Sequence, residues 1–140
     1  MSVIWFYGLS GSGKTTLADL LAEKIPNSQR LDGDIVRKDL TRDLGFDIGD
    51  RFENIRRVCF VADLLSKNGI TVIASFITPL KAMRFYLKTV LGSRLKLIYV
   101  DCSLKRCIKR DPKGLYKKAL RGEIDNFTGL TSVFEEGGKS

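Results

Sequence analysis

The feature that most constrains this chain is the sequence GLSGSGKT at residues 8–15, which fits the pattern GxxxxGK[ST]. A short bulky run, VIWFY at residues 3–7, stands before it, and residues 14–25 follow with helical apolar spacing up to a proline. In the order strand, glycine loop and helix, backbone N–H groups and the helix N-terminus converge and bind phosphate oxygens. The sequence therefore predicts a protein that binds a nucleoside triphosphate.

Within this loop, called the P-loop below, the polar residue types have separate chemical tasks. The Lys14 ammonium is expected to reach the β- and γ-phosphates, and the Thr15 hydroxyl to ligate Mg²⁺, the expected cofactor. The residues predicted to contact the triphosphate are Gly8, Ser10, Gly11, Ser12, Gly13, Lys14, Thr15 and Thr16.

The rest of the chain alternates between strand-like and helix-like segments. Short β-rich runs lie at residues 29–31, 70–76 and 95–100, and helical spacing lies at residues 50–67, 81–91 and 104–109. This alternation is typical of a parallel sheet with helices on both faces. It predicts a three-layer α/β P-loop NTPase fold with a parallel, mostly five-stranded sheet, as one domain over residues 1–140. The second strand is expected beside the first.

The charge balance and the absence of histidine narrow the chemistry. Without histidine the chain has no Ser-His-Asp triad and no imidazole zinc site, so a general base must be a carboxylate, a lysine or a tyrosine. Lys and Arg number 24 against 16 acidic residues, and residues 81–122 hold thirteen of these basic residues but only two acids. Such a surface attracts anions, so small nucleotides and nucleic acid are both candidates on charge alone.

The cysteines and the apolar runs indicate the cellular setting. Cys59, Cys102 and Cys107 form neither an even set nor a CxxC pair, which favours free thiols in a reducing cytoplasm. The apolar runs are too short to span a bilayer, and no basic segment precedes the first of them, as a secretory signal would require. We therefore expect a cytoplasmic protein without membrane contact.

A second group of candidates lies in DGDIVRKDLTRDLGF, residues 32–46. The chain lacks the Asn-Lys-x-Asp guanine motif, and a P-loop domain of this length most often transfers a phosphoryl group to a small molecule. Asp32 and Asp34 follow the second strand, where carboxylates hold Mg²⁺ or accept a hydroxyl proton, or else cap the next helix. Arg37 either binds an anion or lies on the surface. Phe46 either stacks on a base or fills the core, and its spacing favours the core.

With these stretches, the sequence resembles the adenylylsulfate kinases. The matching stretches are GLSGSGKTT, LDGD-x-VR, RDLGF, DR-x-ENIRR, FI-x-P, RDPKGLYKKA and NFTG, which together span residues 8–129. RDPKGLYKKA followed by FTG is specific to this family and its near relatives. The resemblance implies an ATP-dependent kinase that phosphorylates the 3′-hydroxyl of adenosine 5′-phosphosulfate (APS) to give 3′-phosphoadenosine 5′-phosphosulfate. It also implies a basic lid at about residues 111–128 that closes over both nucleotides and excludes water.

The resemblance further implies catalytic and anion-binding roles by position. Asp34 would be the base or metal-side carboxylate, with Asp32 supporting it, and Lys14 would act on the transferred phosphoryl group. Arg37 and Arg51 would bind the phosphosulfate end of APS.

Other residues are implied as contacts of the two bases and of the lid. Phe46 and Phe127 would sandwich the APS adenine between aromatic faces. Thr78 stands at a position that is a phosphorylated serine in some relatives. The remaining implied contacts are Asn54, Ile77 and the lid residue Lys117 for the acceptor, and Arg110 for the ATP adenine.

Several residues depart from the family pattern and keep alternatives open. Ile35, Leu80 and Lys81 differ near the acceptor, and FEEG at residues 134–137 stands where the family has Tyr-Glu-Ala-Pro near the ATP adenine. One alternative is a sister kinase with another small nucleotide acceptor, such as a cytidine diphosphoramidate used in capsule modification. The other is a P-loop nucleotide-binding protein without transfer activity. The expected partners are ATP and a small nucleotide rather than nucleic acid, and the family implies a homodimer.

Overall fold

The computed structural model describes residues 1–123, 127–128 and 134–137. Its centre is a parallel sheet in the strand order β2-β3-β1-β4. The strands are β1 (Val3–Tyr7), β2 (Ser28–Asp32), β3 (Thr71–Ser75) and β4 (Leu95–Tyr99). Because all four strands run in one direction, their carboxyl ends lie at the same edge of the sheet, where α/β proteins bind their ligands.

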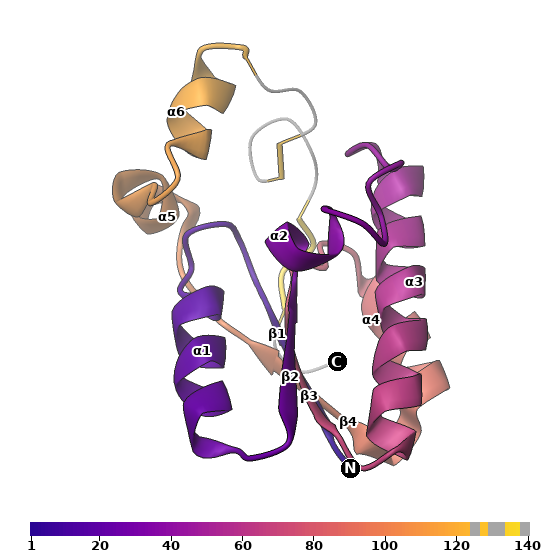
Figure 1. Ribbon diagram of the computed structural model, residues 1–140. Coiled ribbons are helices and arrows are strands. Elements are labelled where there is room, and N and C mark those ends of the chain that lie inside the picture. The colour runs from indigo at the N-terminus through magenta and orange to yellow at the C-terminus, as the bar shows by residue number, and fades with distance from the viewer. Residues whose placement is uncertain (124–126, 129–133, 138–140) are drawn as a thin grey trace.

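Helices cover both faces of this sheet, which confirms the predicted three-layer α/β fold (Figure 1). Helix α1 lies on one face, α3 and α4 lie on the other, and α2, α5 and α6 lie toward the carboxyl ends of the strands. The helices are α1 (Lys14–Lys24), α2 (Gly33–Val36), α3 (Ile48–Lys67), α4 (Lys81–Leu91), the 3₁₀ turn Gly92–Arg94, α5 (Leu104–Arg110) and α6 (Leu115–Leu120). Within the described ranges, no helix is both long and apolar enough to cross a membrane.

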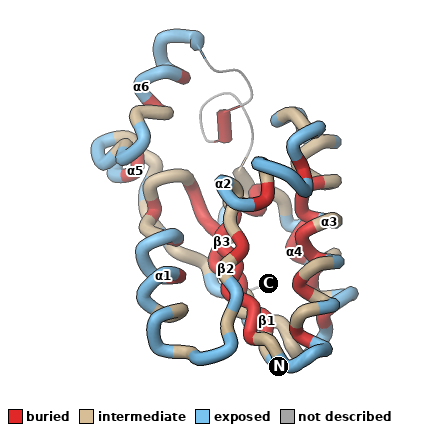
Figure 2. The backbone as a smooth tube through the Cα atoms, in the orientation of Figure 1, coloured by how far each residue is buried: buried red, intermediate tan, exposed pale blue. Residues whose placement is uncertain are grey.

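Strands β1 and β3 are central, which explains their largely apolar sequences, VIWFY and TVIAS. All five residues of β3 and four of the five residues of β1 are buried. One face of the sheet packs on α3 and α4 in a core that includes Val58 and Leu87. The other face packs on α1 in a core that includes Ala18 and Ile73. Figure 2 shows this buried layer between helices whose outer faces are exposed.

Two details of the predicted sheet differ from the structure. In the described residues the sheet has four strands rather than five, because the chain passes from β4 into α5 and α6. The expectation that β2 lies beside β1 is wrong, because β3 pairs with both of them. The sequence of β2, SQRLD, is too polar for a central strand, whereas β3 is entirely buried.

Candidate active site

A cavity of about 580 Å³ opens at the carboxyl edge of the sheet. The P-loop forms one wall, and the segments after β2 and β3, the first half of α3 and the α5–α6 connection form the others. The predicted site residues that line it are Ser10, Gly11, Gly13, Lys14, Thr15, Thr16, Asp32, Asp34, Arg37, Phe46, Arg51, Asn54, Ile77, Thr78 and Arg110. Residues predicted separately for the phosphoryl donor and for the acceptor thus share one cavity.

Two glycines are required by the shape of the P-loop. Gly8 has a φ of 151°, and a Cβ at this position would lie 2.7 Å from the carbonyl oxygen of Val100. Gly13 has a φ of 101° at the N-cap of α1. Only glycine adopts these conformations without strain, and they turn the chain directly from β1 into α1. The N-terminus of α1 is therefore held at the cavity, where its dipole favours an anion.

Lys14, the first residue of α1, is folded back onto the P-loop. Its Nζ donates a hydrogen bond to the carbonyl oxygen of Leu9 over 2.7 Å, and the residue is only 8% exposed. Burial lowers the pKa of this ammonium from 10.5 to about 8, and the nearby positive charge of Lys113 acts in the same direction. A phosphate bound in the cavity would supply the negative charge that this buried ammonium lacks.

Nucleotide binding should consequently depend on pH above neutrality. The free protein loses the Lys14 proton as the pH rises through about 8, whereas the complex needs the ammonium. We expect the Kd for ATP to rise about tenfold between pH 7 and pH 9, because one proton must be taken up on binding. Titration of the protein with ATP across this range measures the effect. Lys14→Arg is the control, since its guanidinium stays charged and should remove the slope.

Asp32 and Asp34 both line the cavity but have different partners. Asp32 Oδ1 accepts the Ile35 N–H over 2.8 Å and caps α2, and its Oδ2 lies 3.5 Å from Arg30 Nη2. The capping interpretation that the sequence left open therefore applies to Asp32. Asp34 lies in the first turn of α2, and 72% of its side chain is exposed. Asp34 is the carboxylate that is better placed to meet a ligand.

Lys113 is a cavity residue that sequence reasoning missed. It lies between α5 and α6, and its Nζ is 2.7 Å from Asp34 Oδ2, so it joins the predicted lid to the predicted base. The family resemblance pointed instead to Lys117, which does not line the cavity and whose N–H is bonded to Asp111 Oδ2. A motif with several lysines gives no sequence signal for choosing between them.

Phe46 and two arginines form the part of the cavity that the sequence predicts to bind the acceptor. The core position predicted for Phe46 from spacing is wrong, because the residue is 52% exposed. The Arg37 guanidinium lies 4.2 Å from the centre of its ring, and Arg51 Nε donates to the Phe46 carbonyl oxygen over 2.6 Å. Burial lowers the pKa of both arginines, and the charge of Arg37 lowers that of Arg51 further. Two cations beside an aromatic face suit an anionic nucleotide.

Asn54 and Thr78 also line the cavity. Asn54 is 5% exposed, and its Oδ1 has no hydrogen-bond partner among the described residues. An unpaired buried oxygen costs about 1–3 kcal/mol, which a ligand N–H or O–H would recover. The Thr78 hydroxyl accepts from Trp5 Nε1 over 2.9 Å and donates to the Phe76 carbonyl oxygen, and the residue is 1% exposed. Phosphorylation of Thr78 stays a prediction and would require this hydroxyl to leave its buried position.

The remaining predicted residues lie outside the cavity lining. Gly8 and Ser12 belong to the P-loop but do not line the cavity. Phe127 also does not line it: the residue is 8% exposed, and its ring meets Tyr116 edge-on at 4.8 Å. The adenine sandwich between Phe46 and Phe127 therefore stays a prediction.

A small third core joins the P-loop to α5 and α6. The Tyr116 hydroxyl donates to the carbonyl oxygen of Ser10 over 2.7 Å. Apolar packing strengthens the connection, and the buried members of this core are Leu9, Cys107, Tyr116, Ala119 and Phe127. The P-loop side of the cavity thus rests partly on the segment predicted to be the lid.

A parallel sheet whose first strand runs into GLSGSGKT, with a cationic cavity at the strand ends, defines a P-loop nucleotide-binding protein. The model of the adenylylsulphate kinase family matches residues 1–140. The chain belongs to this family.

Known relatives and a solved structure agree with this assignment. The chain is 49% identical over 137 residues to the probable adenylyl-sulfate kinase of Pseudomonas aeruginosa, a match that covers 95% of this chain and 64% of that protein. It is 52% identical over 136 residues to the adenylyl-sulfate kinase of Halothermothrix orenii, covering 94% of this chain and 73% of that protein. The APS kinase of Mycobacterium tuberculosis in complex with AMPPNP and APS matches with a TM-score of 0.91 and 41% identity, over 99% of this chain and 84% of that one.

Proposed function

We propose that this protein transfers the γ-phosphoryl group of ATP to the 3′-hydroxyl of APS, giving 3′-phosphoadenosine 5′-phosphosulfate and ADP. The observation that carries the proposal is the shared cavity, which is lined both by the P-loop and by the group formed by Arg37, Phe46 and Arg51. The family assignment and a similar solved structure that contains AMPPNP and APS support it.

On the donor side, the P-loop residues bind and orient the triphosphate. The Lys14 ammonium neutralises charge on the transferred phosphoryl group, and the helix dipole of α1 acts on the same phosphates. Their contribution is largely positional, because phosphoryl transfer requires the attacking oxygen, phosphorus and leaving oxygen to lie in line.

On the acceptor side, Asp34 receives the proton of the 3′-hydroxyl. As this oxygen forms its new bond to phosphorus, the bond between the γ-phosphorus and the β–γ bridging oxygen breaks and ADP leaves. Arg37 and Arg51 hold the phosphosulfate group, and the exposed ring of Phe46 offers a face for the adenine. The unpaired Oδ1 of Asn54 accepts a hydrogen bond from the acceptor.

The donor set of the cavity fits Mg²⁺ bound together with ATP. Among the described residues, no group of three or more His, Cys, Asp or Glu side chains could hold a metal ion. Mg²⁺ commonly binds through substrate phosphates with one or two protein oxygens, and here the Thr15 hydroxyl would hold it. Asp34, the other predicted ligand, takes the base role in this mechanism instead. When bound, the ion neutralises charge on the β- and γ-phosphates.

The residues that kept a cytidine-type acceptor open lie outside the cavity lining. Leu80 packs against the main core, Ile35 is exposed, and the Lys81 N–H donates to Glu135 Oε1. They give no reason to prefer the sister reaction. The presence of Lys14 and Asp34 in the cavity argues against a protein without transfer activity.

Three further expectations stay predictions. They are a homodimer, a cytoplasmic location, and a lid formed by residues 111–128, of which residues 124–126 lie outside the described part of the chain.

An ADP-release assay tests the proposed function. The protein with Mg-ATP is given APS, adenosine monophosphate, a cytidine nucleotide or no acceptor. We expect release stimulated by APS alone, with the product phosphorylated at the ribose 3′ position. If the cytidine nucleotide stimulated ADP release instead, the acceptor would be a cytidine nucleotide and not APS. If the protein bound ATP but no acceptor stimulated ADP release, the assignment as a transferase would be wrong.

The exposed ring of Phe46 should matter for the acceptor and little for the fold. Phe46→Ala is expected to raise the KM for APS by about tenfold, because base–aromatic stacking contributes about 1–3 kcal/mol. The melting temperature should change little, because the ring is half exposed. Initial rates at varied APS and varied ATP, with a thermal melt, measure both. An equal rise in the KM for ATP would contradict the placement of Phe46 on the acceptor side.

A further inference from the structure

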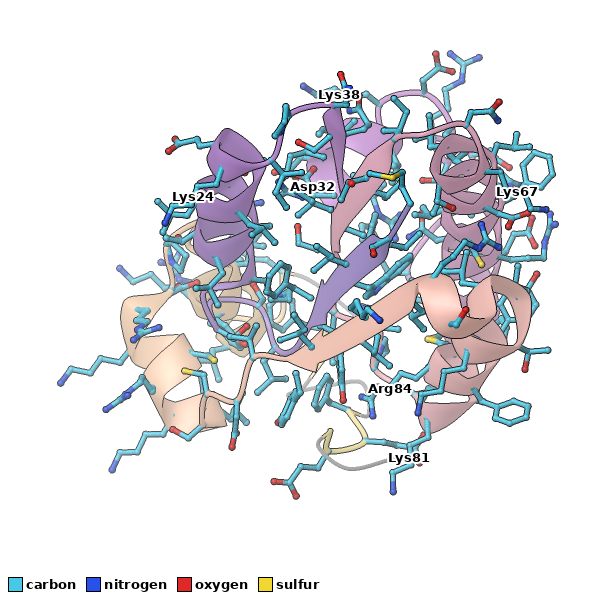
Figure 3. The ribbon with its side chains drawn as sticks, turned by 90° about the horizontal axis from the view of Figure 1, so that it is seen from below. Lys24, Asp32, Lys38, Lys67, Lys81 and Arg84 are labelled. Carbon is cyan, nitrogen blue, oxygen red and sulfur yellow. The ribbon has the colours of Figure 1, made fainter. Side chains whose placement is uncertain are left out.

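Arg84 is a buried arginine that the proposed mechanism does not use. It lies in α4 and is 2% exposed, and its guanidinium carbon is 4.4 Å from the ring centre of Tyr7 and 5.3 Å from that of Phe134. Figure 3 shows Arg84 and Lys81 on the side of α4 that faces the short segment of residues 134–137. A buried guanidinium needs partners for its donors, so its hydrogen bonds indicate what it holds.

Those hydrogen bonds join two segments that are far apart in sequence. Arg84 Nε donates to the Thr78 carbonyl oxygen over 3.1 Å, and Nη2 donates to the Pro79 carbonyl oxygen over 3.3 Å. The same guanidinium donates from Nη2 to the Glu135 carbonyl oxygen over 2.6 Å, and from Nη1 to that of Glu136 over 3.4 Å. One side chain thus fixes the backbone of residues 78–79 and of residues 135–136 together.

Glu135 strengthens this connection from the other side. Its N–H donates to the Pro79 carbonyl oxygen over 2.7 Å, and its Oε1 accepts the Lys81 N–H over 2.9 Å. Helix α4 has no capping side chain of its own at Leu80, so Glu135 supplies the missing acceptor and a favourable charge at that N-terminus.

Gly137 shows how closely this segment is fitted. A Cβ at this position would lie 2.5 Å from Tyr7 Oη and 2.6 Å from Tyr99 Cγ. The two tyrosine rings stack on each other at 5.1 Å. A larger residue at Gly137 would therefore move residues 134–137 or separate the rings, without touching the cavity.

We infer that Arg84 is a positioning residue for the acceptor wall, and that residues 134–137 act on acceptor binding through it. Thr78 and Pro79 line the cavity, whereas Arg84 and residues 134–137 do not. Thr78 also has a φ of 49°, a strained conformation for threonine that persists only where its surroundings hold it. The hydrogen bond from Arg84 to the Thr78 carbonyl oxygen contributes to that hold, beside the bond from Trp5 to the Thr78 hydroxyl. Glu135 holds the neighbouring Pro79. The expected effect on the KM for APS rests on the proposed function, whereas the positioning of residues 78–79 by Arg84 does not.

The test uses the full 140-residue chain, two variants and a matched control. Arg84→Lys keeps the charge but loses the fork that reaches both segments, and Gly137→Ala moves the segment while leaving Arg84 in place. Glu136→Ala is the control, because its side chain is exposed and its carbonyl oxygen is retained. Initial rates give the two KM values and kcat. The emission of Trp5 gives a readout independent of activity, because this only tryptophan of the chain is buried and donates to Thr78.

We expect both variants to raise the KM for APS about tenfold, the size of effect that the loss of about one directional interaction with the acceptor produces. The KM for ATP and kcat should change less than about threefold. Trp5 emission should shift in both variants and remain unchanged in the control. Equal increases in the two KM values, or a lower melting temperature with unchanged kinetics and emission, would overturn the inference. If the unaltered protein showed no APS-stimulated turnover, the proposed function would fail. The emission shifts would then still decide whether Arg84 positions residues 78–79.

Discussion

Asp34→Asn is expected to lower kcat by about 10²- to 10⁴-fold, the range typical of a lost general base, while the Kd for ATP changes little. The asparagine keeps the size of the side chain but cannot take the 3′-hydroxyl proton. The side chain is 72% exposed and α2 is capped by Asp32, so the fold should not suffer. Single-turnover kinetics with a separate ATP titration divide the effect between chemistry and binding.

Asp39→Asn is the matched control for this variant. Asp39 is an exposed carboxylate that follows α2 and does not line the cavity. Its replacement removes the same charge from the same region and should leave kcat within about twofold, since exposed charges contribute little at a distance. A similar loss of kcat in both variants would show that the effect comes from the change in overall charge. Full activity of Asp34→Asn would remove Asp34 from the mechanism.

Lys14→Met is expected to weaken ATP binding and to lower kcat by about 10²- to 10³-fold, because it removes the cation that neutralises the transferred phosphoryl group. The same variant should not destabilise the free protein. Burial lowers the pKa of Lys14, which means that keeping its ammonium charged and buried costs free energy. Methionine has a similar length but is apolar, so it does not carry this cost. Thermal melting without nucleotide and initial rates with Mg-ATP and APS measure the two effects.

Lys24→Met provides the comparison at the other end of the same helix. Lys24 is exposed in the last turn of α1, where its charge complements the helix dipole. Its replacement should leave turnover unchanged and lower the melting temperature slightly. Unchanged activity of Lys14→Met would contradict the assignment of the phosphate site to the P-loop.

The parts of the site that depend on neighbouring residues could be predicted from the sequence. The P-loop works through consecutive backbone groups after one strand, so GLSGSGKT was enough to place Lys14 and Thr15 in the cavity. Asp34 could be predicted for a related reason: it follows a parallel strand, and all carboxyl ends in such a sheet meet at one edge. Asp34 lines the cavity even though β2 pairs with β3 and not, as expected, with β1.

The parts that depend on tertiary packing could not be predicted. Phe46 has the spacing of a core residue, but the core is completed without it and two arginines occupy its surroundings. Lys113 contacts Asp34 because the chain turns between α5 and α6, which a lysine-rich motif does not reveal. The sequence did not indicate that Arg84 is buried, because an arginine in a basic amphipathic helix is normally exposed to solvent. FEEG was noted only as a departure from the family pattern, and nothing in the sequence indicated that Gly137 packs against Tyr7 and Tyr99.

The small core of Leu9, Cys107, Tyr116, Ala119 and Phe127 has a consequence for local unfolding. Proteins open in contiguous units whose free energies of opening are lower than that of global unfolding, and a few buried side chains apart from the main core form such a unit. Because Tyr116 is bonded to Ser10, opening α6 would free the P-loop backbone that is proposed to bind the phosphates. A bound triphosphate therefore opposes this opening by mass action. Amide protons of α6 near Tyr116 and Ala119 should exchange with solvent more slowly when ATP is present, although neither residue lines the cavity.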